Sequence, residues 1–210
     1  MDEIQYMLKP DWVSWAAIKE CFLKAHESNR KKGVVMQNQF MTPEEFEQNY
    51  KDAYFFVALR GEEVIGTSAF FIRTMNKWWA RNKKVIYNCA DAIIPEFKGT
   101  DVYLDLTGLR TKYIKETGIR IIQSDTEENN KLILKLNDKH GGKKVKLYAS
   151  PKTWYYSVVM VRWLDGCPYS DWYCNFRFIL SCLFVKLLWK PGRKLRFIPS
   201  KKKTNTHDIY

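Results

Sequence analysis

Residues 87–106 decide the fold of this protein, and they read YNCADAIIPEFKGTDVYLDL. The first half is an apolar run that predicts a strand, and the strand must end at Pro95 because proline has no amide proton for a neighbouring strand. A turn with Gly99 follows, and then a helix pattern begins. Thr100 or Asp101 can cap this helix, because a short side-chain oxygen accepts hydrogen bonds from first-turn amides. Those amides and the positive end of the helix dipole attract anions, so the stretch predicts a phosphate-binding unit.

The segment resembles the central motif of the GNAT superfamily of N-acetyltransferases, in which a Val-x-Pro-like strand end precedes an Arg/Gln-x-x-Gly-x-Gly/Ala turn. Residues 93–99, Ile-Ile-Pro-Glu-Phe-Lys-Gly, match the first half of that motif. Asp101 and Tyr103 depart from it, since the family has small residues there that let the backbone approach a phosphate. The resemblance implies acetyl-CoA as the acyl donor, with its pyrophosphate on the turn amides and its pantetheine along the strand. The residues implied in this binding are Ala92, Ile93, Ile94, Lys98, Gly99, Thr100, Asp101 and Val102.

The rest of the chain completes a predicted order β-α-α-β-β-β-α-β-α-β-β. Runs rich in β-branched and aromatic residues predict strands at 3–8, 54–60, 64–72, 119–123, 143–149 and 155–163, besides the central one. Helical spacing predicts helices at 12–32, 42–51 and 129–139, besides the one after Gly99. This order resembles the GNAT fold, which implies an α+β protein with a mixed, mostly antiparallel, splayed central sheet flanked by helices. We predict a GNAT-like domain over residues 1–165 and a basic C-terminal helical extension over residues 166–210.

Three predicted helix starts rest on capping residues. Asp11 can cap the first helix, and Thr42 with Pro43 marks the second, because proline suits the first helical position. Residues 125–128, Asp-Thr-Glu-Glu, have the spacing of a capping box and predict the start of a helix near Asn129.

Composition places the protein among globular chains of a reducing compartment. The hydrophobic content is 46% with 15% aromatic residues, which excludes a disordered chain. The five cysteines show no paired short spacing, and Cys167 and Cys174, for example, are seven residues apart. This spacing argues against a disulfide framework and against a zinc site. The acidic N-terminus lacks the apolar run of a signal peptide, so we expect a cytoplasmic protein.

The family's reaction is the attack of an amine on the thioester of acetyl-CoA, which needs a base, and Asp91 is our candidate. It is the carboxylate of the central strand, and a carboxylate shielded by apolar neighbours can take up a proton. The motif of the family's last helix begins with an asparagine and ends with a tyrosine, which acts as the acid for the leaving thiolate. Here Asn130 fits the first position, and Asn137 stands where the tyrosine would be. An asparagine can hold the leaving thiolate by a hydrogen bond, and Tyr103 and Tyr148 are the alternatives as proton donors.

The acceptor is predicted to be the amine of a small molecule, such as an amino sugar of an envelope polysaccharide, and a homodimer fits this reading. A second reading is a GNAT-fold protein that has lost catalysis and works as a binding module, which the departures at Asp101, Tyr103 and Asn137 favour. A third reading takes the net charge of +12 as a sign of nucleic-acid binding. The charge is concentrated in the tail and no nucleic-acid motif is present, which argues against that third reading.

The C-terminal tail is the anomaly of the sequence. Residues 166–210 contain nine Lys and Arg against Asp171 and Asp208, a net charge of +7. Residues 176–189 are nearly all apolar, a length that suits an interfacial or buried helix and is too short to span a bilayer. One hypothesis is that residues 176–203 bind an anionic membrane surface. The other is that the helix packs back on its own domain or on a second subunit.

Overall fold

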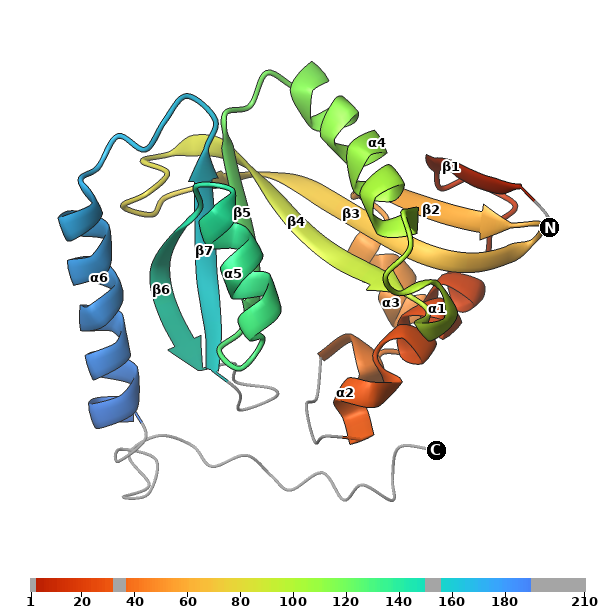
Figure 1. Ribbon diagram of the computed structural model, residues 1–210, viewed down its shortest axis with the longest axis horizontal. Helices are drawn as coiled ribbons and strands as arrows, with labels where there is room; N and C mark the ends of the chain where they lie inside the picture. Colours follow the sequence, from red (N-terminus) through yellow and green to blue (C-terminus); the bar gives the residue numbers. More distant parts are fainter. Residues whose placement is uncertain (1–2, 32–36, 150–155, 190–210) are drawn as a thin grey trace. The chain divides into compact units, whose positions relative to one another are not determined.

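The computed structural model describes residues 3–31, 37–149 and 156–189, and the chain forms two compact units that meet in sequence between Ile122 and Gln123. Figure 1 shows the elements in chain order: β1 (Ile4–Leu8), α1 (Trp15–Ala25), α2 (Glu27–Lys31), η1 (Gln37–Phe40), α3 (Pro43–Tyr50), β2 (Tyr54–Arg60), β3 (Glu63–Met75), β4 (Lys83–Ile93), η2 (Pro95–Phe97), α4 (Val102–Glu116), β5 (Ile121–Glu127), α5 (Lys131–Lys139), β6 (Lys143–Ala149), β7 (Tyr156–Trp163), α6 (Asp171–Leu183) and η3 (Phe184–Trp189). The predicted order of strands and helices is confirmed, and so is the α+β class with its mostly antiparallel sheet.

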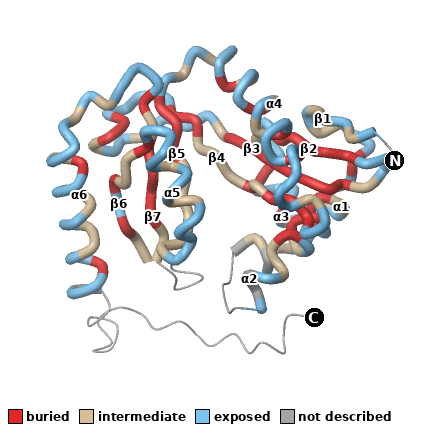
Figure 2. The backbone as a smooth tube through the Cα atoms, viewed as in Figure 1, coloured by how far each residue is buried: buried red, intermediate tan, exposed pale blue. Residues whose placement is uncertain are grey.

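The first unit pairs its strands in the order β1-β2-β3-β4, each antiparallel to the next. Phe55 and Phe56 are neighbours on β2, so their side chains point to opposite faces of the sheet. The ring of Phe55 lies 5.2 Å from that of Trp15 in α1, whereas the ring of Phe56 lies 5.1 Å from that of Tyr113 in α4. Helix α1 therefore covers one face and α4 the other, and β2 and the first part of β3 are buried (Figure 2).

The first helix begins later than predicted. Its N-cap is Ser14, whose Oγ accepts a hydrogen bond from the amide of Ala17 at 3.1 Å, and the proposed cap Asp11 is wrong. The reason is a turn closed by the amide of Val13, which donates to the carbonyl of Pro10 and buries the Val13 side chain. The predicted single helix also ends early, at Ala25, and α2 follows as a separate element.

The other two capping predictions had opposite outcomes. The predicted cap at Thr42 is confirmed and belongs to a capping box, because the Thr42 hydroxyl accepts from the amide of Glu45 and the Glu45 carboxylate accepts from the amide of Thr42. The box predicted at residues 125–128 is wrong, because β5 extends to Glu127 and Asn130 caps α5. Strand pairing with distant residues outweighed the local capping pattern at this point.

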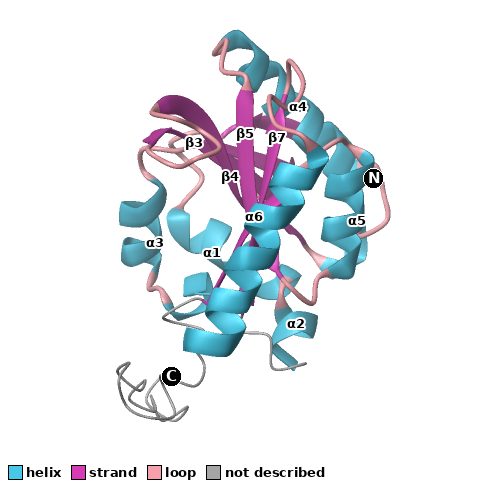
Figure 3. Ribbon diagram, turned by 90° about the vertical axis from the view of Figure 1, so that its left-hand side faces the viewer, coloured by secondary structure: helices cyan, strands magenta, loops and turns pink. Residues whose placement is uncertain are grey.

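The second unit orders its strands β5-β7-β6, with β6 antiparallel to β7. Its core contains Leu147, Val158 and Met160 from the strands together with Val185 from η3, and side chains of α5 and α6 pack against them. Helix α6 lies over strand β6 in this unit, and Figure 3 views it from outside. One face of the C-terminal helix thus packs within this unit, as one of the two hypotheses held, and the basic residues after 189 lie outside the described residues.

Two local features complete the second unit. The side chain of Ser181 in α6 accepts a hydrogen bond from the amide of Leu147 at 2.7 Å, which ties the helix to the edge of β6. The sulfur atoms of Cys167 and Cys174 lie 3.9 Å apart as free thiols, a proximity that their spacing in the sequence did not indicate. The predicted domain boundary at residue 165 stays a prediction.

Candidate active site

Strand β4 carries a β-bulge shortly before it ends. Its register against β3 shifts between Thr67 and Ala69, so that Ala90 and Asp91 together oppose Ser68. Ala90 has a φ of +54°, a strained value for a residue with a Cβ. The buried Thr67 hydroxyl holds it there by donating to the Ala90 carbonyl at 2.7 Å. Strain of this kind persists where neighbours enforce it, and it is common next to active sites.

The bulge presents Asp91 to a buried cation. The Arg110 guanidinium lies 2.5 Å from Oδ1 of Asp91, and the Ser68 hydroxyl donates to the same oxygen at 2.6 Å. The Arg110 side chain is 9% exposed and the Asp91 side chain is 36% exposed. Burial alone would lower the pKa of Arg110, but the Asp91 carboxylate outweighs it and the pKa of Arg110 is raised. Both donors therefore meet the same oxygen, Oδ1 of Asp91.

Sequence reasoning missed Arg110, although a signal was present. The buried residues of α4 are Val102, Leu106, Arg110 and Ile114, which recur every four residues along one face of the helix. A charge at a core position of such a stripe must be paired, so the stripe predicts a buried ion pair. Nothing in the sequence identifies Asp91 as its partner.

Tyr103 and Cys89 lie near enough to the ion pair of Asp91 and Arg110 for its charges to affect their pKa values. Burial and the Asp91 carboxylate raise the pKa of the Tyr103 phenol, so it stays protonated and can donate a proton or a hydrogen bond at neutral pH. Burial, followed by the Asp91 charge, also raises the pKa of Cys89, which keeps it an inert thiol. Tyr103, one of the two alternative acids, thus lies near enough to Asp91 to feel its charge.

The three predicted strand amides point in different directions. The Ile94 amide donates to the carbonyl of Ile65 in β3 at 3.0 Å, so it is already engaged inside the sheet. Backbone groups alternate along a strand, which turns the Ile93 amide to the side of β4 away from β3.

The predicted pyrophosphate turn forms as a short 3-10 helix, η2, followed by an open bend. Gly99 has a φ of +87°, and a Cβ built there meets no atom within 4 Å, so the bend has room above it. The Lys98 ammonium donates to the carbonyl of Ala25 at 2.7 Å, at the C-terminal end of α1. Thr100 donates to the Phe97 carbonyl and accepts from the amide of Val102 at 3.4 Å.

Of the two predicted caps of α4, Thr100 accepts a hydrogen bond from the amide of Val102, the first residue of the helix. Asp101 occupies the N-cap position but makes no capping hydrogen bond with its side chain. The first amide of α4 with a helical partner is that of Asp105, which donates to the Asp101 carbonyl. The amides before it carry the positive end of the helix dipole of a fifteen-residue helix, the physical basis of an anion site.

The two predicted asparagines belong to the second unit. The side chain of Asn130 caps α5 by accepting from the amide of Ile133 at 3.4 Å. Asn137 lies in the last turn of α5 against Gly142, where an added Cβ would sit 1.9 Å from the Asn137 side-chain oxygen. The alternative acid Tyr148 donates its hydroxyl proton to the Asp125 carboxylate at 3.0 Å. Asn130 and Asn137 therefore both have structural roles, at the two ends of α5.

His26, at the C-terminal end of α1, lies close to the candidate site. The centroid of its ring lies 4.4 Å from that of Phe22, with the two rings tilted, and the imidazole forms a hydrogen bond with the backbone of Asp91. Burial, followed by the nearby Lys98 ammonium, lowers the pKa of His26 to about 4. A neutral imidazole thus connects α1 to the bulge of β4.

This lowered pKa predicts a pH-dependent stability. The unfolded histidine takes up a proton near pH 6.5 and the folded one only near pH 4, so the stabilisation is complete above pH 6.5 and is lost as the pH falls toward 4. We expect wild-type protein to lose about 2 kcal/mol more unfolding free energy than His26→Gln between pH 7 and pH 5, measured by urea unfolding. The comparison cancels the carboxylates common to both proteins, and equal losses would contradict the prediction.

Comparison with known proteins finds similar structures but no similar sequence. No protein-family model and no curated protein matches the sequence. Solved acetyltransferase structures do match: a GNAT-family acetyltransferase of Staphylococcus aureus is 13% identical, with a TM-score of 0.57 over 77% of this chain and 99% of that chain. An acetyltransferase of Streptococcus agalactiae is 19% identical, with a TM-score of 0.56 over 77% of this chain and 98% of that chain. A putative acetyltransferase of Acinetobacter baylyi is 11% identical, with a TM-score of 0.59 over 81% of this chain and 98% of that chain.

The protein has the fold of the GNAT acetyltransferases. At these identities the likeness concerns the arrangement of the chain, and the reaction has to be argued from the residues. The nearly complete coverage of the matched structures means that the whole of their fold has a counterpart here.

Proposed function

We propose that the protein is an N-acetyltransferase that transfers the acetyl group of acetyl-CoA to the amine of a small molecule. The observation that carries the proposal is the sequence of β-bulge, Pro95, open Gly99 bend and α4 N-terminus, formed within the GNAT fold. The bend and the first turn of α4 would hold the pyrophosphate, and the Ile93 amide would pair with pantetheine. Acetyl-CoA is the substrate that such an arrangement of amides suits.

The chemistry transfers one acyl group and one proton. The amine nitrogen attacks the thioester carbonyl carbon, the carbon–sulfur bond breaks, and the amine proton leaves to a base. Asp91 is the proposed base through Oδ2, because its Oδ1 is anchored by Ser68 and Arg110. The thiolate of CoA then takes up a proton.

Two residues remain as proposals for the thiolate. Asn137 would hold it by a hydrogen bond, as the resemblance implies, and its side-chain nitrogen is buried. Tyr103 would supply a proton, because its phenol stays protonated beside Asp91. If Tyr103→Phe loses turnover and Asn137→Ala keeps the wild-type turnover, Tyr103 is the residue that serves the thiolate.

Within this proposal the acceptor is an amino sugar. Trp78 lies half-buried in the basic turn between β3 and β4, and aromatic faces beside Lys and Arg suit sugar rings. Its neighbour Trp79 is buried and seals the core. We also retain as proposals a cytoplasmic location, a homodimer and a peripheral contact of residues 176–203 with a membrane.

Calorimetric titration tests the proposal against its alternatives. We expect saturable binding of CoA and of acetyl-CoA, and release of free thiol when acetyl-CoA is mixed with a panel of amines that includes amino sugars. Binding without any thiol release across the panel would favour the binding-module reading. Binding of DNA or RNA, with no heat and no thermal shift at millimolar CoA, would contradict the proposal.

A further inference from the structure

Helix α6 and η3 present apolar side chains on two faces. One face packs into the second unit through Cys174, Phe178 and Val185. The opposite face is exposed and is called the outer stripe here. Its members are Trp172, Phe176, Ile179, Leu180, Leu183, Phe184 and Leu187.

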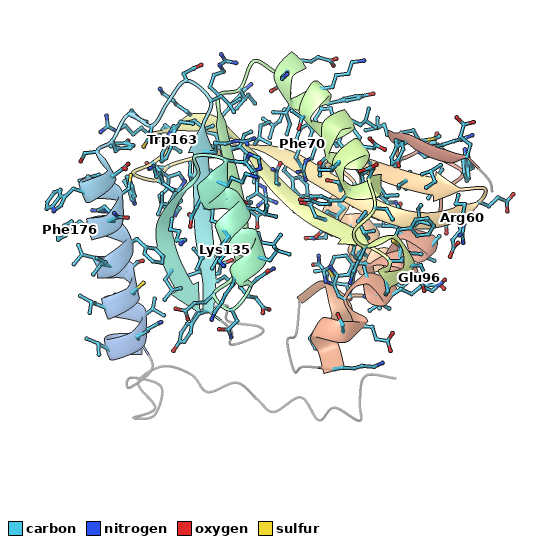
Figure 4. The ribbon with its side chains drawn as sticks, in the orientation of Figure 1. Arg60, Phe70, Glu96, Lys135, Trp163 and Phe176 are labelled. Carbon is cyan, nitrogen blue, oxygen red and sulfur yellow. The ribbon has the colours of Figure 1, made fainter. Side chains whose placement is uncertain are left out.

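The outer stripe follows helical spacing. Residues 172, 176, 179, 180, 183 and 187 recur every three or four positions, so they lie along one side of the helix. Trp172 is 71% exposed and Leu187 is 61% exposed, and Figure 4 shows Phe176 on the side of α6 away from β6. An outer helix face is ordinarily polar, as in α1, where Glu20 and Lys24 form an exposed ion pair. A continuous apolar face of this size marks a contact surface.

The formal charges that follow Asp171 in the sequence are all positive up to Asp208. No Asp or Glu occurs between Asp171 and Asp208, whereas nine Lys and Arg do. Arg177 and Lys186 are on the helix itself, where the Lys186 ammonium forms an ion pair with the Glu128 carboxylate of the same unit. The other basic residues follow directly in the chain and lie outside the described residues.

This charge decides between two occupants of the outer stripe. Two copies joined through their stripes would bring together two segments of net charge +7, which repel each other. An anionic lipid surface attracts the same charges, and each basic residue near it strengthens binding about fivefold. Tryptophan, phenylalanine and leucine beside basic residues are typical of helices that lie in the bilayer interface.

We propose that the outer stripe of α6 and η3 docks on the surface of an anionic lipid bilayer, with the basic residues beside it facing the headgroups. Across residues 3–31, 37–149 and 156–189 no helix is long and apolar enough to cross a membrane, and the inner face of α6 stays packed on β6. The contact is therefore peripheral. It is independent of acetyl transfer, so either proposal can fail alone.

Sedimentation of the full-length protein with vesicles tests the contact. At low salt we expect the protein to pellet with vesicles of phosphatidylcholine and phosphatidylglycerol, and to remain in the supernatant with phosphatidylcholine alone. Phe176→Ser/Leu183→Ser should lower the partition coefficient about 100-fold, because two apolar side chains no longer enter the interface. The control Leu8→Ser/Leu132→Ser changes two exposed leucines on β1 and α5 in the same way and should leave binding unchanged.

Each other outcome overturns the proposal. Wild-type protein that stays in the supernatant with anionic vesicles rules out the contact, and equal binding to neutral vesicles rules out its electrostatic part. Wild-type-like binding of the stripe variant, at an unchanged melting temperature, excludes the stripe as the contact. A lipid-free dimer that Phe176→Ser/Leu183→Ser converts to a monomer, seen by light scattering, would show that a second copy covers this face.

Discussion

Asp91→Ala is expected to lower the free energy of unfolding by about 3 kcal/mol, because it leaves the Arg110 guanidinium buried without its anion. Arg110→Met should cost less, since the Asp91 side chain is 36% exposed and water can reach it. The double variant should be more stable than Asp91→Ala alone, because it removes both charges together. Urea unfolding of the four proteins measures these differences as a double-mutant cycle. Additive effects of the two substitutions would contradict a coupled ion pair.

The same residue allows its proposed chemistry to be separated from its structural role. Asp91→Asn keeps an oxygen that can accept from Ser68 and Arg110, so the fold should be largely retained. If Asp91 is the base, turnover should fall by about 100-fold or more while CoA affinity stays nearly constant. Ser68→Ala is the control, because it removes one anchor and keeps the carboxylate. Wild-type turnover of Asp91→Asn with an accepted amine would exclude the base role.

Lys98→Glu is expected to weaken CoA binding about 100-fold. A carboxylate roughly 5 Å from a phosphate costs about 3 kcal/mol at an effective dielectric near 20, and the lost ammonium adds to that. Calorimetry measures the dissociation constant. Because the Lys98 ammonium also donates to the Ala25 carbonyl, the melting temperature of the unliganded variant must be measured beside it.

Lys115→Glu is the matched control for this experiment. It makes the same charge change on the exposed surface in the last turn of α4, far along the helix from the bend. A global electrostatic effect would weaken CoA binding equally in both variants, whereas the proposed site predicts weakening in Lys98→Glu alone. An unchanged dissociation constant for Lys98→Glu would place the pyrophosphate elsewhere.

The sequence by itself determined the features that depend on neighbours in the chain. Pro95 cannot donate to a strand, and Gly99 adopts a φ that other residues avoid, so the strand end, the bend and the following helix could be read directly. The capping box at Thr42 is likewise a contact across three residues. The regular alternation and helical spacing of apolar residues predicted the order of elements, because burial of one face follows from period alone.

Only the tertiary structure decided the features that join distant residues. Residues 125–128 have the local pattern of a helix start, yet pairing within the sheet makes most of them part of β5. Residues 176–189 have the composition of an interfacial helix, and the fold uses one face of that helix for the core and leaves the other exposed.

The candidate site shows the same division. Asp91 could be chosen from the sequence as the carboxylate of the central strand, but its partners Ser68 and Arg110 come from β3 and α4. The bulge at Ala90 is held by the Thr67 hydroxyl, a contact over twenty-three residues. Such positions depend on how strands pair and helices pack, and no local pattern encodes that pairing. The sequence therefore specified the strand end and the bend after it, and the packing of three elements specified the contacts around Asp91.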